Sequence, residues 1–295
     1  MDIKEEIHNS FKEGTTLTKL IYINLGVFLV VGLIASILTL FKVDPGWTRL
    51  LMLPADFQAL LNTPWTIISY MFSHTGFIHL LFNVLMLFWF GKFFMELFSQ
   101  RDLVGLYLIA GVAGGIFYLL AYHTFPFFEE KIAGSYLLGA SASVLGIIVA
   151  VAVTAPNYPV RFLPLRFLFM GEIRLKWIAV GGVIISLLNV ASSNAGGEIA
   201  HLGGAFAGYV FAVTYKKGIN ITTWVNTLLD VLVDLFRKKP ELKVTHRRPM
   251  TDQEYNLKKK QENDNIDRIL EKIKKGGYES LSKEEKQELF RVSQK

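Results

Sequence analysis

Six long runs without a charged side chain constrain this 295-residue chain more than any other feature of its sequence. A helix needs about 20 consecutive apolar residues to cross the hydrocarbon core of a membrane. The six runs are Leu20–Phe41, Pro64–Gly91, Leu103–Phe128, Ile132–Val160, Trp177–Gly197 and Ile199–Tyr215. Several are longer than one span needs and must include loops, so six spans is the simplest count. Because the mean hydropathy of +0.36 is high for a water-soluble protein of this length, we expect an all-α integral membrane protein.

Charged residues are segregated along the chain, and this divides it into four expected regions. Residues 1–19 form a cytoplasmic N-terminal segment, and residues 20–215 form the six-span domain. Residues 216–236 form a juxtamembrane amphipathic segment that lies on the membrane lipid. Residues 237–295 are dense in Lys, Glu, Asp and Gln and form a soluble helical tail in the cytoplasm. Much of the net charge of +6 comes from basic residues beside the spans, so we expect no nucleic-acid partner.

Two helices are expected in the tail. One covers Asn265–Lys275 and ends at Gly276 and Gly277. The other is opened by a capping box at Ser282–Glu285 and runs to about Val292. The tail either binds a cytoplasmic partner or is a solvated appendage, and the sequence leaves both open.

Basic residues in the connections set the expected orientation of the spans. Arg101 follows the second span, Arg174 the fourth and Lys216 the sixth. The other connections carry few basic residues, beside Glu129 and Glu198. Because basic loops stay in the cytoplasm, an even number of spans places both termini there. We expect a multi-pass protein of a bacterial inner membrane.

Four polar side chains occur near the same end of these runs. The even-numbered spans run from outside to inside, so His79 and Asn83 in the second, Ser141 in the fourth and His201 in the sixth share a depth in the outer half of the membrane. An ionisable residue inside a span is a functional-site hypothesis, because hydrocarbon disfavours it. Taken singly, the serine would usually bond a carbonyl of its own helix and the asparagine a neighbouring helix. The shared depth of all four favours a function.

A serine and a histidine at one depth indicate nucleophilic catalysis. A serine hydroxyl becomes a nucleophile when histidine removes its proton, and the oxyanion that follows needs donors already aimed at it. Ser141 and His201 would be nucleophile and base, while His79 and Asn83, four residues apart on one helical face, would be donors. Ser143 is the rival nucleophile, but it points to nearly the opposite face of the helix, so only one of the two serines can meet His201.

Small residues supply the close approach that this pair requires. Gly139 precedes Ser141, and Gly204 and Gly208 form a small-xxx-small pair in the sixth span. Such residues let helix backbones come close, so we expect all three glycines to pack helices around the pair.

No metal and no cofactor are expected. The chain has no cysteine, which excludes thiolate nucleophiles, zinc-thiolate sites and iron–sulfur clusters. A metal site at His74 and His79 would need further ligands, and no carboxylate cluster supplies them.

These residues lie in motifs that resemble those of the rhomboid family of intramembrane serine proteases, over roughly residues 60–215. The motifs are Gly139-Ala140-Ser141-Ala142, Ala200-His201-Leu202-Gly203-Gly204 with Gly208, and His74-x4-His79-x3-Asn83. The resemblance implies a six-helix rhomboid-like bundle in which Ser141 attacks the scissile carbonyl and His201 acts as base and then acid. It implies an oxyanion hole made by His79, Asn83 and the Ser141 N–H. The implied substrates are transmembrane segments of other proteins, cut near the outer face.

The resemblance also implies lateral substrate access past the fifth span, with the loop Ala191–Glu198 as a lid. Ser143 stands where the family usually has Gly, and Leu145 stands where many members carry an aromatic residue that stacks on the catalytic histidine. No buried Asp is available as a third member of the pair. Glu198 is expected in water at the rim of the membrane, so that Glu198→Ala keeps most activity.

Two other functions are open at this point. A catalytically inactive rhomboid-like protein would bind transmembrane clients without cutting them, although such relatives typically lack the serine or the histidine. A transporter or channel would also carry polar residues in its spans. Against that function, no charged residue is centred in any of the six runs.

Overall fold

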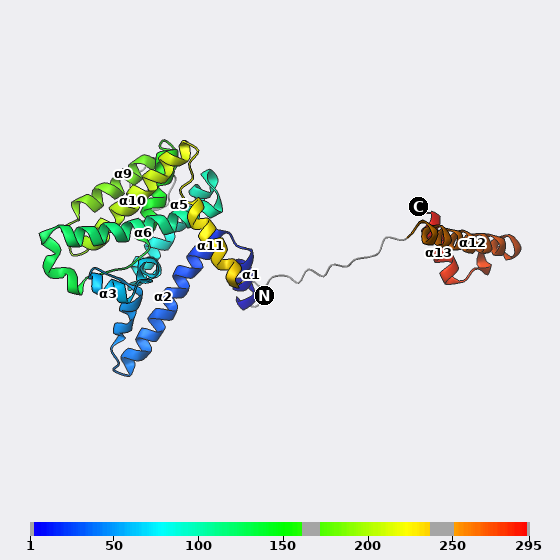
Figure 1. The fold of residues 1–295 in the computed structure, drawn as a ribbon, viewed down its shortest axis with the longest axis horizontal. Coiled ribbons are helices and arrows are strands. Elements are labelled where there is room, and N and C mark those ends of the chain that lie inside the picture. Colours follow the sequence, from blue (N-terminus) through cyan, green and yellow to red (C-terminus); the bar gives the residue numbers. More distant parts are fainter. Residues whose placement is uncertain (1–2, 161–171, 237–250, 294–295) are drawn as a thin grey trace. The chain divides into compact units, whose positions relative to one another are not determined.

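The computed structural model describes residues 3–160, 172–236 and 251–293, which fold mostly as helices. The chain divides into two compact units, Met1–Arg237 and Lys238–Lys295. The first unit contains all six apolar runs and is coloured blue to yellow in Figure 1.

Each apolar run contains one long helix. In the second and fourth runs this helix begins well after the start of the run, and in the other four it covers most of the run. These helices are α2 (Thr16–Leu40), α5 (Phe77–Leu97), α6 (Gln100–Thr124), α7 (Ser141–Thr154), α9 (Leu175–Leu188) and α10 (Ala195–Lys216). Within the described residues, α2, α5 and α6 are long and apolar enough to cross a membrane. α7 and α9 are shorter apolar helices of 14 residues each, and α10 has 22 residues with Glu198 in its first turn.

The helix in the second run begins later than the run itself. The run starts at Pro64, but α5 starts at Phe77. Between them, Tyr70 and Met71 are buried in the core of the unit rather than placed in a long span. Hydropathy does not distinguish a side chain buried by protein from one that faces lipid, which is why the run looked continuous.

A short β pair ties together the loops that precede α5 and α7. The connection from α2 to α5 contains η1 (Pro45–Leu51), β1 (Leu53–Pro54), α3 (Phe57–Asn62), α4 (Thr66–Ser69) and η2 (Tyr70–Phe72). β1 pairs antiparallel with β2 (Tyr136–Leu137), which follows η3 (Pro126–Gly134) and lies just before α7. The N-terminal end of α7 is therefore attached to the loop that leads into α5.

α7 lies at the centre of the first unit. Every residue from Ala142 to Ala152 is buried. Helices α5, α6, α9 and α10 all pack against it, and α10 packs in turn on α6 and α9 (Figure 1). A helix that is apolar on all sides needs such complete enclosure by protein or lipid.

Glycines bring the backbones of α7 and α10 into direct contact. A Cβ atom on Gly204 would overlap the carbonyl oxygen of Ala142, and one on Gly208 would overlap that of Gly146. Gly146 is enclosed as well, because a Cβ there would lie 2.8 Å from the carbonyl oxygen of Gly204. Any side chain at these positions would push the two helices apart.

A second β pair follows α7. β3 (Pro159–Val160) pairs antiparallel with β4 (Ile173–Arg174) directly before α9. The aromatic and basic residues of Pro156–Ile173 indicate a loop at the membrane surface, and residues 161–171 of it lie outside the described residues.

The ends of the first unit are also helical. α1 (Ile3–Glu13) packs beside α2 within the expected N-terminal segment. α11 (Thr223–Phe236) falls in the expected amphipathic segment and packs on α6. The buried Asp102 at the start of α6 anchors it, accepting hydrogen bonds from Asn220 (2.7 Å) and Thr222 (2.6 Å).

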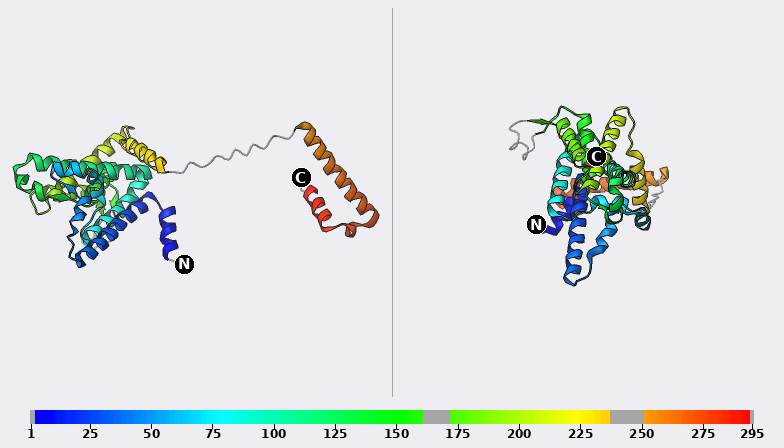
Figure 2. Two further views of the ribbon diagram at one scale, coloured as in Figure 1. Left: turned by 60° about the horizontal axis from the view of Figure 1, so that its bottom comes forward. Right: turned by 90° about the vertical axis from the view of Figure 1, so that its left-hand side faces the viewer.

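The second unit consists of α12 (Asp252–Gly276), η4 (Tyr278–Ser280) and α13 (Lys283–Ser293), with α12 and α13 packed on each other (Figure 2). α12 begins 13 residues earlier than the expected start at 265, at a capping box between Thr251 and Glu254. It ends at Gly276 and is capped by Gly277, where φ is 75°, so the two glycines end the helix as predicted. The capping box that opens α13 is confirmed, because Ser282 and Glu285 exchange hydrogen bonds of 2.8 and 3.3 Å.

We predict that Gly208→Ala destabilises the first unit, because the added methyl group would overlap the backbone of α7. Overpacking of this kind costs roughly 1–3 kcal/mol. Gly32→Ala on α2 is the matched control, since nothing lies within 4 Å of a Cβ atom there. Thermal unfolding of the purified protein in detergent should show a lower midpoint for Gly208→Ala and no loss for Gly32→Ala. Equal midpoints would contradict the contact.

Candidate active site

Ser141 is the first residue of α7, and the loop before it is held in place from both sides. Gly139 has φ of 109°, a left-handed conformation that favours glycine. Its N–H donates to the carbonyl oxygen of Tyr70 at 2.9 Å. The next N–H, of Ala140, donates to Nε2 of His74 at 3.3 Å. These bonds fix the position at which α7 begins. Gly139 thus shapes the loop before α7, and the side chain packed against it is His79 of α5 rather than a residue of α10.

The hydroxyl of Ser141 lies in hydrogen-bond contact with His201. His201 sits in the second turn of α10, and its Nε2 is 2.7 Å from Ser141 Oγ. The backbone contact at Gly204 lies one turn further along α10, on Ala142. The side chains can meet because no side chain separates the two helices next to them.

The other ring nitrogen of His201 has two polar neighbours. Ser186 Oγ on α9 is 3.1 Å from Nδ1, and Glu198 Oε2 on α10 is 3.2 Å from it. The expectation that Glu198 lies in water at the rim is therefore wrong. Its side chain is only 14% exposed, because three residues along a helix bring it over the same face as His201. Ser186 was not predicted from the sequence, although it is the one hydroxyl among the apolar residues of α9, with Ser192 and Ser193 following in the loop.

His79 and Asn83 lie on one face of α5 and line the same cavity as Ser141. The His79 ring covers Gly139, where a Cβ atom would be 2.8 Å from its Cε1. Asn83 is buried, and its amide donates to the carbonyl oxygen of His79 at 2.9 Å, which leaves a second N–H on the same nitrogen. Helix geometry also leaves the first N–H groups of α7 without acceptors inside the helix. Several donors thus border the space in front of Ser141.

The cavity in front of Ser141 has a volume of about 400 Å³ and two kinds of lining. The polar end holds Ser141, His201, His79, Asn83 and Glu198. Ser186 and Asn194 add two more polar side chains. The remaining lining is mostly apolar and comes largely from α5, α7 and α9, through Phe82, Met86, Val144, Leu145, Ile148 and Ile185. The cavity can therefore take an apolar chain whose backbone reaches the serine.

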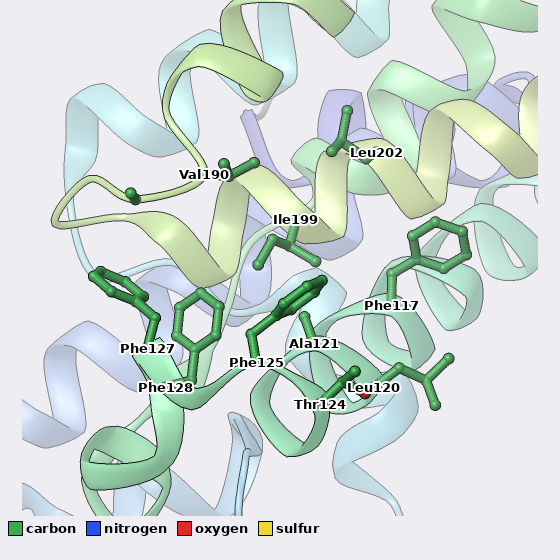
Figure 3. A pocket seen from close by; sticks show the side chains of 11 residues that line it. Phe117, Leu120, Ala121, Thr124, Phe125, Phe127, Phe128, Val190, Ile199 and Leu202 are labelled. Carbon is green, nitrogen blue, oxygen red and sulfur yellow. The ribbon is translucent and has the colours of Figure 1, made fainter.

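A different cavity, of about 510 Å³, lies between α6, the start of η3 and the first turns of α10. Figure 3 shows Phe125, Phe127 and Phe128 on one side of it, with Val190 and Ile199 on the other. No ionisable side chain lines it. It offers no chemistry of its own.

Ser143, the rival nucleophile, points away from the cavity. Its side chain is fully buried, and its hydroxyl lies beside Gly111, where a Cβ atom would be 2.8 Å from it. Its hydroxyl has no hydrogen-bond partner among the described residues. Of the two serines, only Ser141 faces His201.

The expected lid is shorter than the sequence suggested. α10 already begins at Ala195, so only the first part of Ala191–Glu198 is a loop. Gly196 and Gly197, within that expected lid, lie in the first turn of α10. Gly196 is needed for packing there, because a Cβ atom would be 2.8 Å from the ring of Tyr118.

Metal ligands are not grouped in the described part of the chain. No three or more His, Asp or Glu side chains in residues 3–160, 172–236 and 251–293 are placed to hold a metal ion.

The helices and this site define a helical, multi-pass membrane protein. A family model described as "Rhomboid domain" matches residues 61–218, which is more than half of the chain, so the protein belongs to the rhomboid family. A second model, described as a family of unknown function (DUF6576), matches residues 250–295. The chain is also similar to RHOMBOID-like protein 12, mitochondrial, of Arabidopsis thaliana, at 28% identity over 164 residues. That match covers 52% of this chain and 47% of the relative, so the chain spans about half the length of the curated relative it matches.

We predict that Ser143→Ala leaves the protein at least as stable as wild type. The substitution removes a buried hydroxyl that has no partner, which spares a desolvation cost of about 1–3 kcal/mol against the small loss of packing. The thermal midpoint in detergent should stay the same or rise. A clear drop would mean that this hydroxyl makes a bond that supports the fold.

Proposed function

We propose that this protein is an intramembrane serine endopeptidase that cleaves transmembrane segments of other membrane proteins near the outer face. One observation carries the proposal: a serine hydroxyl and a histidine nitrogen lie 2.7 Å apart in a cavity walled by apolar helices. Membership of the rhomboid family supports it, since the family generally comprises serine proteases.

The chemistry needs only residues that border the cavity. His201 Nε2 takes the proton of Ser141 Oγ as the oxygen attacks the scissile carbonyl carbon. The carbonyl oxygen becomes negative and accepts hydrogen bonds from the first N–H groups of α7, from Asn83 and from His79. His201 then gives its proton to the leaving amine, and the C–N bond breaks. Water, activated by the same nitrogen, releases the acyl group and restores Ser141.

The apolar part of the cavity indicates the substrate class. A soluble peptide would gain little from Phe82, Met86 and Ile185, whereas a transmembrane segment already carries apolar side chains that match them. The segment would approach between α5 and α9 and place its carbonyl against Ser141. In the described chain α9 packs closely on α7, α10 and β4. Side chains of both α5 and α9, Phe82 and Ile185 among them, line the cavity, so a segment entering between these two helices would reach it.

The proposal includes six spans, formed by α2, α5, α6, α7, α9 and α10, in the domain 20–215. Segment 1–19, the amphipathic segment 216–236 and the tail 237–295 would then lie on the cytoplasmic side of a bacterial inner membrane. The family of unknown function that matches the tail adds no role, and binding of a cytoplasmic partner there stays a prediction.

We predict that a fluorophosphonate probe labels the wild-type protein covalently and fails to label Ser141→Ala. The reason is that such probes bond to a serine whose proton is removed by a neighbouring base. Ser143→Ala is the matched control and should label like wild type. Gel fluorescence of the purified protein measures all three. Folded wild type without label would favour the inactive client binder.

We also predict the orientation of the connections. The chain has no cysteine, so single cysteines at Glu130, in η3, and at Lys217, after α10, report their side of the membrane without background. A membrane-impermeant maleimide should label Glu130→Cys on intact cells and label Lys217→Cys only after permeabilisation. If both cysteines were labelled on intact cells, the η3 connection and the end of α10 would lie on the same side of the membrane, and the proposed six-span topology would be wrong.

A further inference from the structure

The proposed mechanism uses Nε2 of His201 and leaves its other nitrogen unexplained. Nδ1 lies 3.1 Å from the hydroxyl oxygen of Ser186 and 3.2 Å from a carboxylate oxygen of Glu198. Ser186 is 2% exposed, and the Glu198 side chain is 14% exposed. A carboxylate this well covered is weakly screened by water.

The proton inventory of the ring assigns a direction to these contacts. If Nε2 accepts the proton of Ser141, a neutral His201 must carry its own proton on Nδ1. Nδ1 then donates the hydrogen bond. An ionised carboxylate has no proton to donate, so it can act only as the acceptor. The bond from Nδ1 to Glu198 therefore favours the tautomer in which Nε2 is bare and faces the serine.

The two acceptors differ in what they do when His201 gains a proton. A carboxylate stabilises the positive ring with a charge-assisted hydrogen bond, which is roughly twice as strong as a neutral one. A serine hydroxyl offers only the neutral bond. Glu198 also lies on the same helix as His201, so its distance to the ring does not depend on the position of α9. Besides His201 itself, two ionisable side chains among the described residues line this cavity: Glu198 on α10 and His79 on α5.

We propose that Glu198 is a positioning residue for His201: it holds the ring with Nε2 toward Ser141 and stabilises the charge that the ring acquires. This proposal rests on the proposed protease function. Glu198 would then join Ser141 and His201 as a third residue of the site. Its contact would hold the His201 ring in place, although Leu145 stands where an aromatic residue is often found in the family. Ser186 is the secondary, neutral acceptor.

A structural role for Glu198 must be distinguished from this one. Glu198 lies in the first turn of α10, where a negative charge also stabilises the positive end of the helix dipole. That effect would lower stability when lost, but it would not change the rate of a folded protein.

The test uses the full-length protein in detergent and fluorophosphonate as the probe. Glu198→Gln keeps the shape and loses the charge, Glu198→Asp keeps the charge with shorter reach, and Ser186→Ala removes the neutral acceptor. The readouts are the maximal labelling rate, the half-saturating probe concentration and the thermal midpoint. Ser141→Ala sets the zero.

We expect Glu198→Gln to lower the maximal labelling rate by at least about tenfold. The loss should be smaller than the roughly 10⁴-fold loss seen when the buried carboxylate of a serine protease triad becomes an amide. The half-saturating concentration and the thermal midpoint should change little. Glu198→Asp should recover part of the rate, and Ser186→Ala should lose less than Glu198→Gln.

Three results would overturn the proposal: a wild-type rate in Glu198→Gln, an equal or larger loss in Ser186→Ala, or a rate that falls only together with the thermal midpoint. In each of these cases wild type is still labelled at Ser141, so the protease function stands. Absence of label on folded wild type would instead reject that function and this proposal with it.

Discussion

The backbone contact between α7 and α10 is the interaction on which the rest of the first unit depends. Gly204 and Gly208 lie against the carbonyl oxygens of Ala142 and Gly146, with no room for a side chain. This contact encloses α7 in the bundle and also sets the distance between Ser141 and His201. Dispersion between closely packed helices is a main source of association inside a membrane, where hydrocarbon supplies no hydrophobic drive between them. Fold and site thus depend on the same few glycines.

The site adds polar groups only at the ends of apolar helices. Ser141 begins α7, His201 lies in the second turn of α10, and His79 lies near the start of α5. The β1–β2 pair and the bonds of Gly139 and Ala140 join the loops that lead into α5 and α7. Such placement lets the helix N-termini supply N–H donors, while the apolar flanks remain available to lipid or to a transmembrane segment.

Much of this could be predicted from sequence, for a specific physical reason. Polar residues are costly in apolar runs, so Ser141, His201, His79 and Asn83 stand out, and small residues mark where helices can approach. What the sequence could not show was the environment of each side chain. Pro64–Gly91 reads as one apolar run although Tyr70 and Met71 are buried by protein. Glu198 reads as a rim residue, and its contact with His201 depends on α10 starting as early as Ala195. The length of α12 was not predicted, because its first half is mostly polar, with only Tyr255 and Leu257 apolar, and a capping box marks its start.

Ser141 and His201 should act as one unit, and a comparison of single and double variants is the sharpest check. The measurement is the rate at which detergent-purified protein cleaves a transmembrane substrate, for Ser141→Ala, His201→Ala and the double variant. Residues that act as a unit are strongly non-additive. Each single variant should therefore lose as much activity as the double variant. Losses that multiply, or a His201→Ala variant that still cleaves at a rate near wild type, would contradict it.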